Sequence, residues 1–371
     1  MIILSKTKLK LEYKRKLFFD CGGRCSRCCN ALDYDVFSRA TVESQEYAHI
    51  IGESEDGPRG SDQSRLYSGD ISNIIVLCPT CHTIIDKNLT YYTVARLTNV
   101  KKKHEEKVIK LLDSLKNTES LAVKYTSPIG CVIPVVDEGK MDDAIRESGY
   151  YSSRIPVDLN PNNTVFSDGS QEFWDAEWTQ LSANFSSKIV ALQERGSLTP
   201  VLLFALAPQP LLIRLGTLLS DITDVRVFQK RREPDTWTWD KGEHNQTFCV
   251  LSPIERHETV AVKLSLSDIV ADDRVHAILG KNVSIWTITH EAPKMDFLCH
   301  PNQLEQLRVA YRDFFQQVRA YHGQNAVLHV FPASPNSAAV EFGRTWMQKV
   351  DARLVLYDHV KERGEFVLAY N

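Results

Sequence analysis

The pattern of apolar and polar positions changes period several times along the chain, and each period predicts a different element. Near the N-terminus, Leu9, Tyr13 and Leu17 recur at the spacing of one helix face within a lysine-rich segment. Two short stretches follow that alternate or run apolar over the length of a strand. Pro79 suits the first turn of a further helix. The expected elements are helices over 6–19, from 78 onward and over 101–115, and strands over 42–51 and 71–77.

Beyond residue 136, strand-like and helix-like segments alternate, which is typical of an α/β domain. The composition changes just before this point. We therefore expect a multi-domain α/β protein with a first domain over 1–116, a linker over 117–134 and a second domain over 135–371.

The second domain contains what reads as an internal duplication at an offset of 127 residues. Each copy reads as strand, proline-bearing turn, helix and strand, so each is expected to be a βαβ unit with parallel strands. A ligand of such a fold is expected at the carboxyl ends of the strands, between the two copies. The offset aligns Phe204 with Phe331, Pro208 with Pro335, Gly216 with Gly343 and Arg226 with Arg353.

Composition adds little to this organisation. Hydrophobic residues make up 43% and charged residues 25% of the 371 residues, as in ordinary globular proteins. No apolar run approaches the roughly 18 residues of a membrane span, and the N-terminus is too polar for a secretory signal. A cytoplasmic protein without membrane contact is expected. The net charge is −3, but residues 1–116 carry a positive excess. That excess suits nucleic-acid contact or is an ordinary fluctuation of surface charge.

Six of the nine cysteines lie within the first 81 residues. Clustered cysteines in a cytoplasmic protein favour metal binding over disulfides. Cys25 with Cys28 and Cys78 with Cys81 form two Cys-x-x-Cys pairs, the spacing that holds tetrahedral Zn²⁺. Four thiolates complete the coordination, so this zinc is expected to be structural. Cys29 is an alternative to Cys28, and buried thiols without metal are the other interpretation.

A set of polar residues accompanies the two pairs. It reads Ala48-His49-Ile50, then Asn73, then the run from Leu77 to His82. This pattern resembles the HNH endonuclease family over roughly residues 17–90. The resemblance implies a ββα-metal fold and metal-dependent hydrolysis of DNA.

In such a site His49 would be the general base, because a neutral imidazole accepts a proton near pH 7. Asn73 would orient His49 through an amide hydrogen bond, and His82 would hold a catalytic Mg²⁺ or Mn²⁺ ion. Asp86, four residues further on the same helix face, is a candidate second ligand. Many family members have aspartate where this chain has Ala48, which leaves the full ligand set open. The alternative is a zinc ribbon that binds DNA without cutting it, with His49 in the core.

The repeat region resembles the SAVED domain, a fusion of two CARF-like Rossmann halves that binds cyclic oligonucleotides. The order HNH then SAVED is similar to effector nucleases of the cyclic-oligonucleotide-based anti-phage systems called CBASS. The resembling segments are 227–230, 237–239, 329–343 and 356–358.

Candidate ligand-binding residues are polar or aromatic and lie near the expected strand ends or in these segments. Hydroxyl, amide and main-chain N–H groups at a helix N-terminus suit phosphate. Tryptophan rings can stack on a purine, with core packing as the equal alternative. The candidates are Gln209, Lys230, Trp237, Trp239, Ser334, Asn336, Ser337 and Tyr357.

The sequence thus predicts a cyclic di- or trinucleotide-activated HNH endodeoxyribonuclease that degrades double-stranded DNA and self-associates as a dimer or larger homo-oligomer. A non-catalytic, ligand-responsive DNA-binding regulator with a zinc ribbon is the second hypothesis. An enzyme acting in the second domain, such as a nucleotide hydrolase, is the third. The lack of a Gly-x-Gly-x-x-Gly fingerprint argues against a dinucleotide-dependent oxidoreductase.

Overall fold

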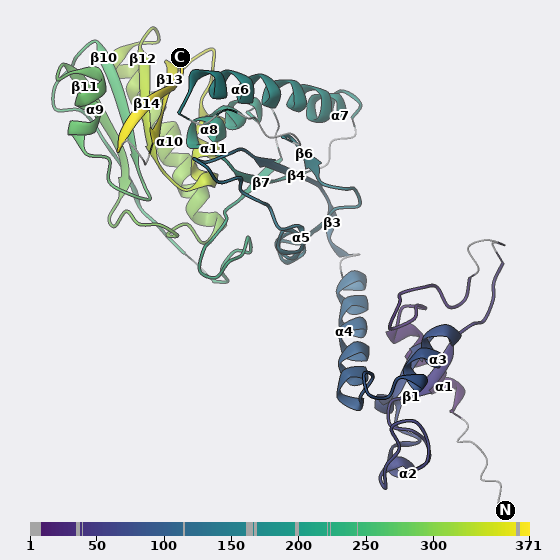
Figure 1. The fold of residues 1–371 in the computed structure, drawn as a ribbon. Helices are drawn as coiled ribbons and strands as arrows, with labels where there is room; N and C mark the ends of the chain where they lie inside the picture. Colours follow the sequence, from purple (N-terminus) through teal and green to yellow (C-terminus); the bar gives the residue numbers. More distant parts are fainter. Residues whose placement is uncertain are drawn as a thin grey trace, which may run out of the picture. The chain divides into compact units, whose positions relative to one another are not determined.

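The chain divides into two compact units, Met1–Lys116 and Asn117–Asn371 (Figure 1). The computed structural model describes all residues except 1–8, 35–37, 39, 114–115, 161–165, 167–168, 197–199, 221, 223, 243 and 361–363. The expected helix residues 6–8 and the expected helix end at 115 therefore lie outside the described residues. Within the described part of the chain, no helix is long and apolar enough to cross a membrane.

The first unit is built on a two-stranded antiparallel sheet with helices packed against it. Ala48 pairs with Ile75 and His49 with Ile74, so His49 is the last residue of its strand. The order strand, strand, helix is the order expected from the sequence. The elements are α1 Leu11–Asp20, β1 Glu46–His49, α2 Ser64–Tyr67, η1 Ile71–Asn73, β2 Ile74–Leu77, α3 Pro79–Lys87 and α4 Val94–Asp113.

Four elements in this unit have boundaries that differ from the sequence expectation. The helix α1 begins at Leu11, so Leu9 and Lys10 of the expected helix lie before it. Residues 71–73 of the expected strand 71–77 form the 3-10 helix η1. The strand β1 is shorter than 42–51, because the N–H groups of Val42 and Ser44 bond to the carbonyls of Asp33 and Leu32 instead of a neighbouring strand. The helix α4 begins before residue 101, because Leu97 is buried in the core of the unit and extends the apolar side of the helix.

The second unit contains a four-stranded and a six-stranded sheet. Its helices are α5 Glu138–Glu147, α6 Gln171–Phe185, the π-helical η3 Ser186–Val190, α7 Ala191–Glu194, α8 Gln209–Leu218, α9 Asp272–Leu279, α10 Pro301–His322 and α11 Asn336–Thr345. Its strands are β3 Thr118–Glu119, β4 Leu121–Thr126, β5 Tyr150–Tyr151, β6 Val157–Asp158, β7 Val201–Leu206, β8 Val225–Phe228, β9 Phe248–Leu251, β10 Thr259–Ser265, β11 Val283–His290, β12 Val327–Ala333, β13 Arg353–Val360 and β14 Glu365–Tyr370.

The four-stranded sheet has the order β6-β4-β7-β8, and all of its strands are parallel. The segment 117–134, expected to be a linker, contributes β4 to the interior of this sheet. Leu121, Val123 and Tyr125 are buried in the core of the unit. The expectation of a linker was wrong. Four of the six residues of β4 are apolar, as is typical of a buried parallel strand, and β4 pairs with β6 on one side and β7 on the other.

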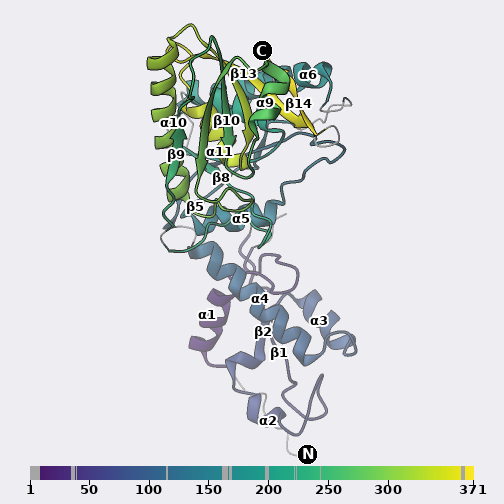
Figure 2. The same cartoon turned by 90° about the vertical axis from the view of Figure 1, so that its left-hand side faces the viewer.

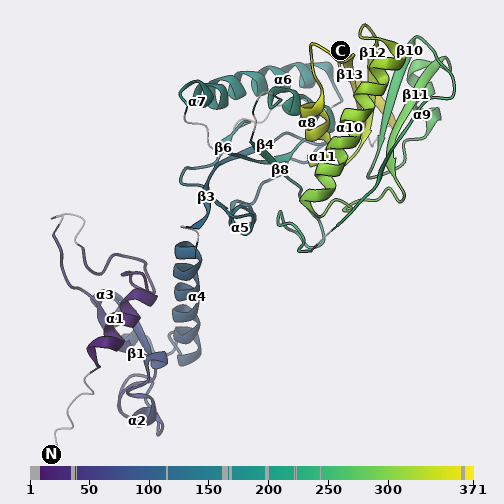
Figure 3. The same ribbon diagram turned by 180° about the vertical axis from the view of Figure 1, so that it is seen from behind.

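The six-stranded sheet has the order β14-β13-β12-β10-β11-β9, with antiparallel strands at both edges. Figure 2 shows α10 lying along this sheet, where Leu307 and Phe314 pack into the common core. Figures 1 and 3 show α8 and α11 between the two sheets. The core of the unit therefore runs from one sheet through these helices to the other.

The duplicated βαβ pattern expected from the sequence is present. One copy is β7-α8-β8 and the other is β12-α11-β13, and the paired strands are parallel in both. The two helices meet at the glycines that the repeat aligns. A Cβ placed on Gly216 would lie 2.1 Å from the carbonyl oxygen of Val340, and one placed on Gly343 would lie 1.9 Å from that of Ile213. The reciprocal contacts indicate an approximate two-fold relation between the copies.

Replacing Gly343 by alanine should strongly destabilise the second unit, because the added methyl group meets rigid backbone that cannot move without separating α8 from α11. We expect a loss of more than about 3 kcal/mol in the free energy of unfolding, at or above the usual cost of overpacking. Urea unfolding followed by tryptophan fluorescence measures it. Gly139→Ala is the control, because its Cβ would contact only the Asp137 carboxylate. Equal stability of Gly343→Ala and the wild type would refute this account of the helix contact.

Candidate functional site

The four cysteines of the two Cys-x-x-Cys pairs come together in the first unit. The Sγ atoms of Cys25, Cys28, Cys78 and Cys81 all lie within 4.8 Å of one another. The Sγ atoms of Cys28 and Cys78 are 3.9 Å apart. Four sulfurs at the Zn–S distance of about 2.3 Å would be separated by about 3.8 Å in a tetrahedron. The donor set and its spacing therefore fit a tetrahedral zinc ion.

Cys28, and not Cys29, belongs to this cluster. Cys29 has a positive φ of 61° and directs its Sγ toward Nδ1 of His104, at 3.8 Å. Arg27 donates from Nη1 to Sγ of Cys81 at 3.2 Å. Burial raises the pKa of Cys81 above its ordinary value, and the Arg27 cation acts in the opposite direction. A cation beside the cluster therefore favours the thiolate form that a metal requires.

His49 lies at the end of β1, at the wall of a cavity of about 610 Å³. Its Nε2 is 3.1 Å from the carbonyl oxygen of Ser68. A carbonyl oxygen only accepts hydrogen bonds, so Nε2 carries the proton of the neutral ring. The lone pair of the neutral imidazole is then on Nδ1. The contact with Ser68 thus prepares His49 to accept a proton at Nδ1.

Asn73 does not hold the His49 side chain, and this part of the sequence expectation is corrected. Its Oδ1 accepts from the N–H of Ile51 at 2.8 Å, and its Nδ2 donates to the carbonyls of Ile51 at 3.0 Å and Tyr67 at 3.2 Å. The amide satisfies backbone groups just beyond β1, where the ladder with β2 ends. Asn73 therefore positions His49 through the main chain.

His82, in the first turns of α3, lies between two carboxylates. Its Nδ1 is 2.7 Å from Oε2 of Glu46, and its Nε2 is 3.2 Å from Oδ2 of Asp86. The expected proximity of His82 and Asp86 is present, because the two residues are one helical turn apart. Sequence analysis missed Glu46, which reaches His82 from β1 across the sheet-to-helix packing. A carboxylate on Nδ1 orients the ring and leaves Nε2 for a cation.

Arg59 is a second residue that sequence analysis missed. Its side chain is only 5% exposed, and its Nη2 donates to Oδ1 of Asp86 at 2.8 Å. Its Nε donates to the carbonyl of Ile50 at 2.7 Å. Arg59 therefore ties its own glycine-containing loop, residues 52–60, to the end of β1 and to α3 around the cavity. The lining residues are Leu9, Lys14, Tyr47, Ala48, His49, Gly52, Glu53, Ser54, Gly57, Pro58, Arg59, Ile74, His82 and Asp86.

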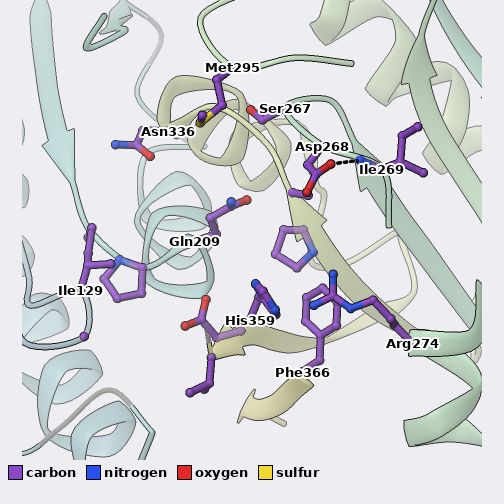
Figure 4. Close-up of a pocket in the computed structure, with 17 residues that line it drawn as sticks. Ile129, Gln209, Ser267, Asp268, Ile269, Arg274, Met295, Asn336, His359 and Phe366 are labelled. Carbon is purple, nitrogen blue, oxygen red and sulfur yellow. Dashed lines mark hydrogen bonds between the residues drawn. The ribbon is translucent and has the colours of Figure 1, made fainter. Parts of the chain in front are cut away.

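A second cavity, of about 690 Å³, lies in the second unit where the parallel strands of both sheets end (Figure 4). Its wall includes residues that follow β7 and β10 and the last residues of β12 and β13, all at the carboxyl ends of these strands. This is the place at which the duplicated βαβ pattern predicts a ligand. The lining side chains that Figure 4 labels come from both halves and include Gln209, Asp268, Arg274, Asn336, His359 and Phe366.

Among the ligand-binding candidates from the sequence, Gln209 and Asn336 line this cavity. Ser334 is almost buried, and its hydroxyl donates to Oε1 of Gln209 at 2.7 Å. Ser337 is 1% exposed, and its N–H and hydroxyl both donate to Oε1 of Gln229, at 3.0 and 2.8 Å. The expected phosphate contact of Ser337 is therefore corrected, because its polar groups join the two halves instead.

The aromatic candidates lie outside this cavity. Trp237 is fully buried and packs edge-on against Phe204, so core packing is the correct alternative for it. Trp239 lines a different pocket, beside Phe228. Tyr357 is buried with its ring stacked on Phe331.

Lys230 is ion-paired with Asp235 in the connection after β8. The lysine does not line the cavity at the strand ends. The expected aromatic side chains and the expected cation Lys230 therefore all lie outside that cavity.

The cation at the cavity is Arg274 of α9, which the sequence analysis did not select. Its guanidinium lies 4.6 Å from the centre of the Phe366 ring (Figure 4). Its Nε and Nη2 are buried and have no hydrogen-bond partner among the described residues. An arginine with unused donors at a cavity wall suits an anionic ligand. The only sequence signal for it is its place in the helix that follows β10.

Two βαβ halves around one cavity define a duplicated α/β ligand-binding protein. The family model described as "SMODS-associated and fused to various effectors sensor domain", or SAVED, matches residues 181–370. The match covers just over half of the chain, and the chain belongs to the SAVED family.

Structures of the Cap4 SAVED/CARF-domain containing receptor from Acinetobacter baumannii are similar to this chain. The one with the cyclic trinucleotide 2'3'3'-cAAA has 12% sequence identity and a TM-score of 0.46. The one with 3'3'3'-cAAA has 13% identity and a TM-score of 0.44. Both alignments cover 83% of this chain and 66% of the receptor chain, so this chain spans just under two thirds of the receptor's length. A search of curated proteins gave no match.

Proposed function

We propose that this protein is a metal-dependent DNA endonuclease of the HNH type, controlled by a cyclic oligonucleotide that binds in the second unit. The observation that carries the nuclease assignment is the arrangement of His49 and the His82–Asp86 pair around one cavity of the first unit. The SAVED membership supports the control by a ligand, because the family description is that of a sensor fused to effectors. The proposed setting is anti-phage defence.

In the proposed reaction, water attacks the phosphorus of a DNA phosphodiester, and the P–O bond to the sugar oxygen breaks. The sugar oxygen leaves with the electron pair of that bond and takes a proton from solvent. His49 takes a proton from the water at Nδ1, since Ser68 occupies Nε2. His82 and Asp86 would hold Mg²⁺ or Mn²⁺, which supplies charge stabilisation at the phosphate and the leaving oxygen. Their ligand atoms are 3.2 Å apart, a separation that two ligands of one octahedral ion can have. Glu46 and Arg59 keep these two side chains oriented.

The four-cysteine cluster would hold a structural zinc ion that joins the segment after α1 to the start of α3. Cys78 is the N-cap of α3, and its Sγ accepts from the N–H of Cys81 at 3.5 Å. Zinc at this point would fix the helix that carries His82 and Asp86. The positive excess of residues 1–116 suits contact with double-stranded DNA, and self-association would allow cuts in both strands.

The cavity of the second unit suits a cyclic oligonucleotide, the ligand class that the SAVED resemblance implies. Its volume of about 690 Å³ is in the range of small-molecule sites, and both halves supply its walls. Arg274 offers its unused donors to a phosphate. Asp268 and Asp358 also line it and can accept hydrogen bonds from base amino groups or ribose hydroxyls.

Arg274→Ala should weaken binding of the activating cyclic oligonucleotide, the messenger. It should also raise the messenger concentration that DNA cutting requires. Charge-assisted hydrogen bonds contribute about 1.5–3 kcal/mol each, so we expect an affinity loss of roughly 10- to 100-fold. Calorimetry with a panel of cyclic di- and trinucleotides measures binding, and plasmid digestion with Mg²⁺ or Mn²⁺ measures cutting. Arg256→Ala is the control, because Arg256 is exposed and does not line this cavity.

The same experiment separates the alternatives. Cutting that needs both a divalent cation and a cyclic oligonucleotide supports the proposal. Binding of a messenger without any cutting would favour the non-catalytic DNA-binding regulator. If no member of the panel binds and plasmid is cut equally with and without it, control by a cyclic oligonucleotide is refuted. Consumption of the messenger without DNA cutting would instead favour an enzyme acting in the second unit.

A further inference from the structure

A second group of metal-binding side chains lies in the second unit, away from the cavity at the strand ends. One carboxylate oxygen of Asp240, one ring nitrogen of His244 and Sγ of Cys299 lie within 4.8 Å of one another. Asp240 and His244 belong to the connection between β8 and β9, and Cys299 comes just before α10. Two distant segments therefore bring a sulfur, a nitrogen and an oxygen ligand to one point.

The backbone around this group is held in place. The N–H of Asp240 donates to the carbonyl of Cys299 at 2.9 Å. Oε1 of Gln303, which is 4% exposed, accepts from the N–H groups of Cys299 at 2.9 Å and His300 at 3.0 Å. The ring of His300 stacks on that of His244, with 5.5 Å between the centroids. Backbone hydrogen bonds thus hold Asp240 and Cys299 in place, and the ring of His300 holds that of His244.

The distances agree with those of a zinc site. Sγ of Cys299 is 3.6 Å from Nδ1 of His244. Ligands at a Zn–S distance of about 2.3 Å and a Zn–N distance of about 2.0–2.1 Å would be about 3.6 Å apart in a tetrahedron. In a catalytic triad of thiol, imidazole and carboxylate, the sulfur and the carboxylate contact opposite nitrogens of the imidazole ring. Here all three ligand atoms converge on one point, which is the arrangement of a metal site.

The charges around the group also admit a cation. Arg231 pairs with Oδ1 of Asp240, and the carboxylate has a second oxygen. The surrounding pocket is lined by one further cation, Lys294, and by two further carboxylates, Glu291 and Asp296. With Cys299 as thiolate, negative charges outnumber positive ones in this pocket.

We propose that Asp240, His244 and Cys299 bind a divalent transition-metal ion of the zinc type, with the fourth position left to water. A thiolate, an imidazole and a carboxylate select such an ion over Mg²⁺ or Ca²⁺. The ion would tie the connection after β8, which carries Trp237 and Trp239, to the start of α10. This site is separate from the four-cysteine cluster and does not depend on the proposed nuclease activity.

The test measures metal binding by the full chain. Protein freed of metal is titrated with CoCl₂, and thiolate-to-cobalt absorption and the equivalents bound per chain are recorded. The wild type should bind one equivalent more than Cys299→Ser and one more than His244→Ala. Cys249→Ser is the control, because Cys249 is an exposed thiol outside the group and should leave the count unchanged. The four-cysteine cluster contributes equally to all of these proteins.

A second measurement covers the case in which Cys299→Ser fails to fold. Added ZnCl₂ should raise the melting temperature of the second unit in the wild type, because a ligand that binds only the folded state stabilises it. The increase should be lost in His244→Ala and in Asp240→Asn, which change half-buried residues of a connecting segment. If the variants and the wild type bind the same number of equivalents and show the same zinc-dependent increase, the proposal is wrong.

Discussion

His49→Ala is expected to reduce plasmid cutting by at least about 100-fold, because general-base catalysis contributes roughly 10²–10⁴-fold to such reactions. The reason is specific to the ring. In the proposed reaction, Ser68 accepts the Nε2 proton, and Nδ1 would take a proton from water. The side chain lies at a cavity wall and is no part of the cysteine cluster. Folding, zinc content and messenger binding should therefore be unchanged. Initial cleavage rates at saturating Mg²⁺ and messenger provide the measurement.

His257→Ala serves as the matched control, since His257 lies in the second unit, where its side chain pairs with Glu255. It should cut DNA at the wild-type rate. Undiminished cutting by His49→Ala would remove His49 from the mechanism. It would also leave the first unit as a DNA-binding module or place the chemistry on other residues.

Cys25→Ser is expected to unfold the first unit and to lower the zinc content by one ion per chain. In structural zinc sites the metal-binding free energy, about 10–16 kcal/mol, is folding free energy. That is as large as the whole stability of a typical domain, about 5–15 kcal/mol. Mass spectrometry of bound metal and limited proteolysis of the first unit measure the two effects. Messenger binding by the second unit should survive.

Cys29→Ser is the matched control for this experiment. Cys29 is close to Cys25 in the sequence, but the fold directs it toward His104 and outside the cluster. It should retain the zinc ion and resist protease as the wild type does. Equal zinc loss from both variants, or full zinc retention by Cys25→Ser, would contradict the assignment of the cluster.

Features that depend on local spacing were predictable from the sequence. Two residues between cysteines place both sulfurs on one turn, so the two pairs of candidate zinc ligands follow from spacing alone. The four-residue spacing of His82 and Asp86 places both on one side of α3. The repeat offset located both βαβ copies, because each copy repeats its own strand and helix periods. The carboxyl ends of those strands located the second cavity.

Features that depend on long-range packing were decided by the tertiary structure. Glu46 reaches His82 because β1 packs beside α3, and no spacing in the chain indicates that contact. Asn73 was assigned to the wrong partner. Its amide bonds to the N–H and carbonyl groups of Ile51, which lie just beyond the end of β1, and not to the His49 ring.

The second unit shows the same division. The sequence pattern around Trp237 allowed either base stacking or burial. The structure shows that Trp237 is buried and packs against Phe204. Residues 121–126 of the expected linker form a strand, because neighbouring strands on both sides satisfy the backbone hydrogen bonds of β4. Arg274 reaches the cavity because α9 and β14 are brought together over it. Local sequence thus determined which elements and which Cys-x-x-Cys pairs form, while burial and contacts between distant segments determined what each polar side chain faces.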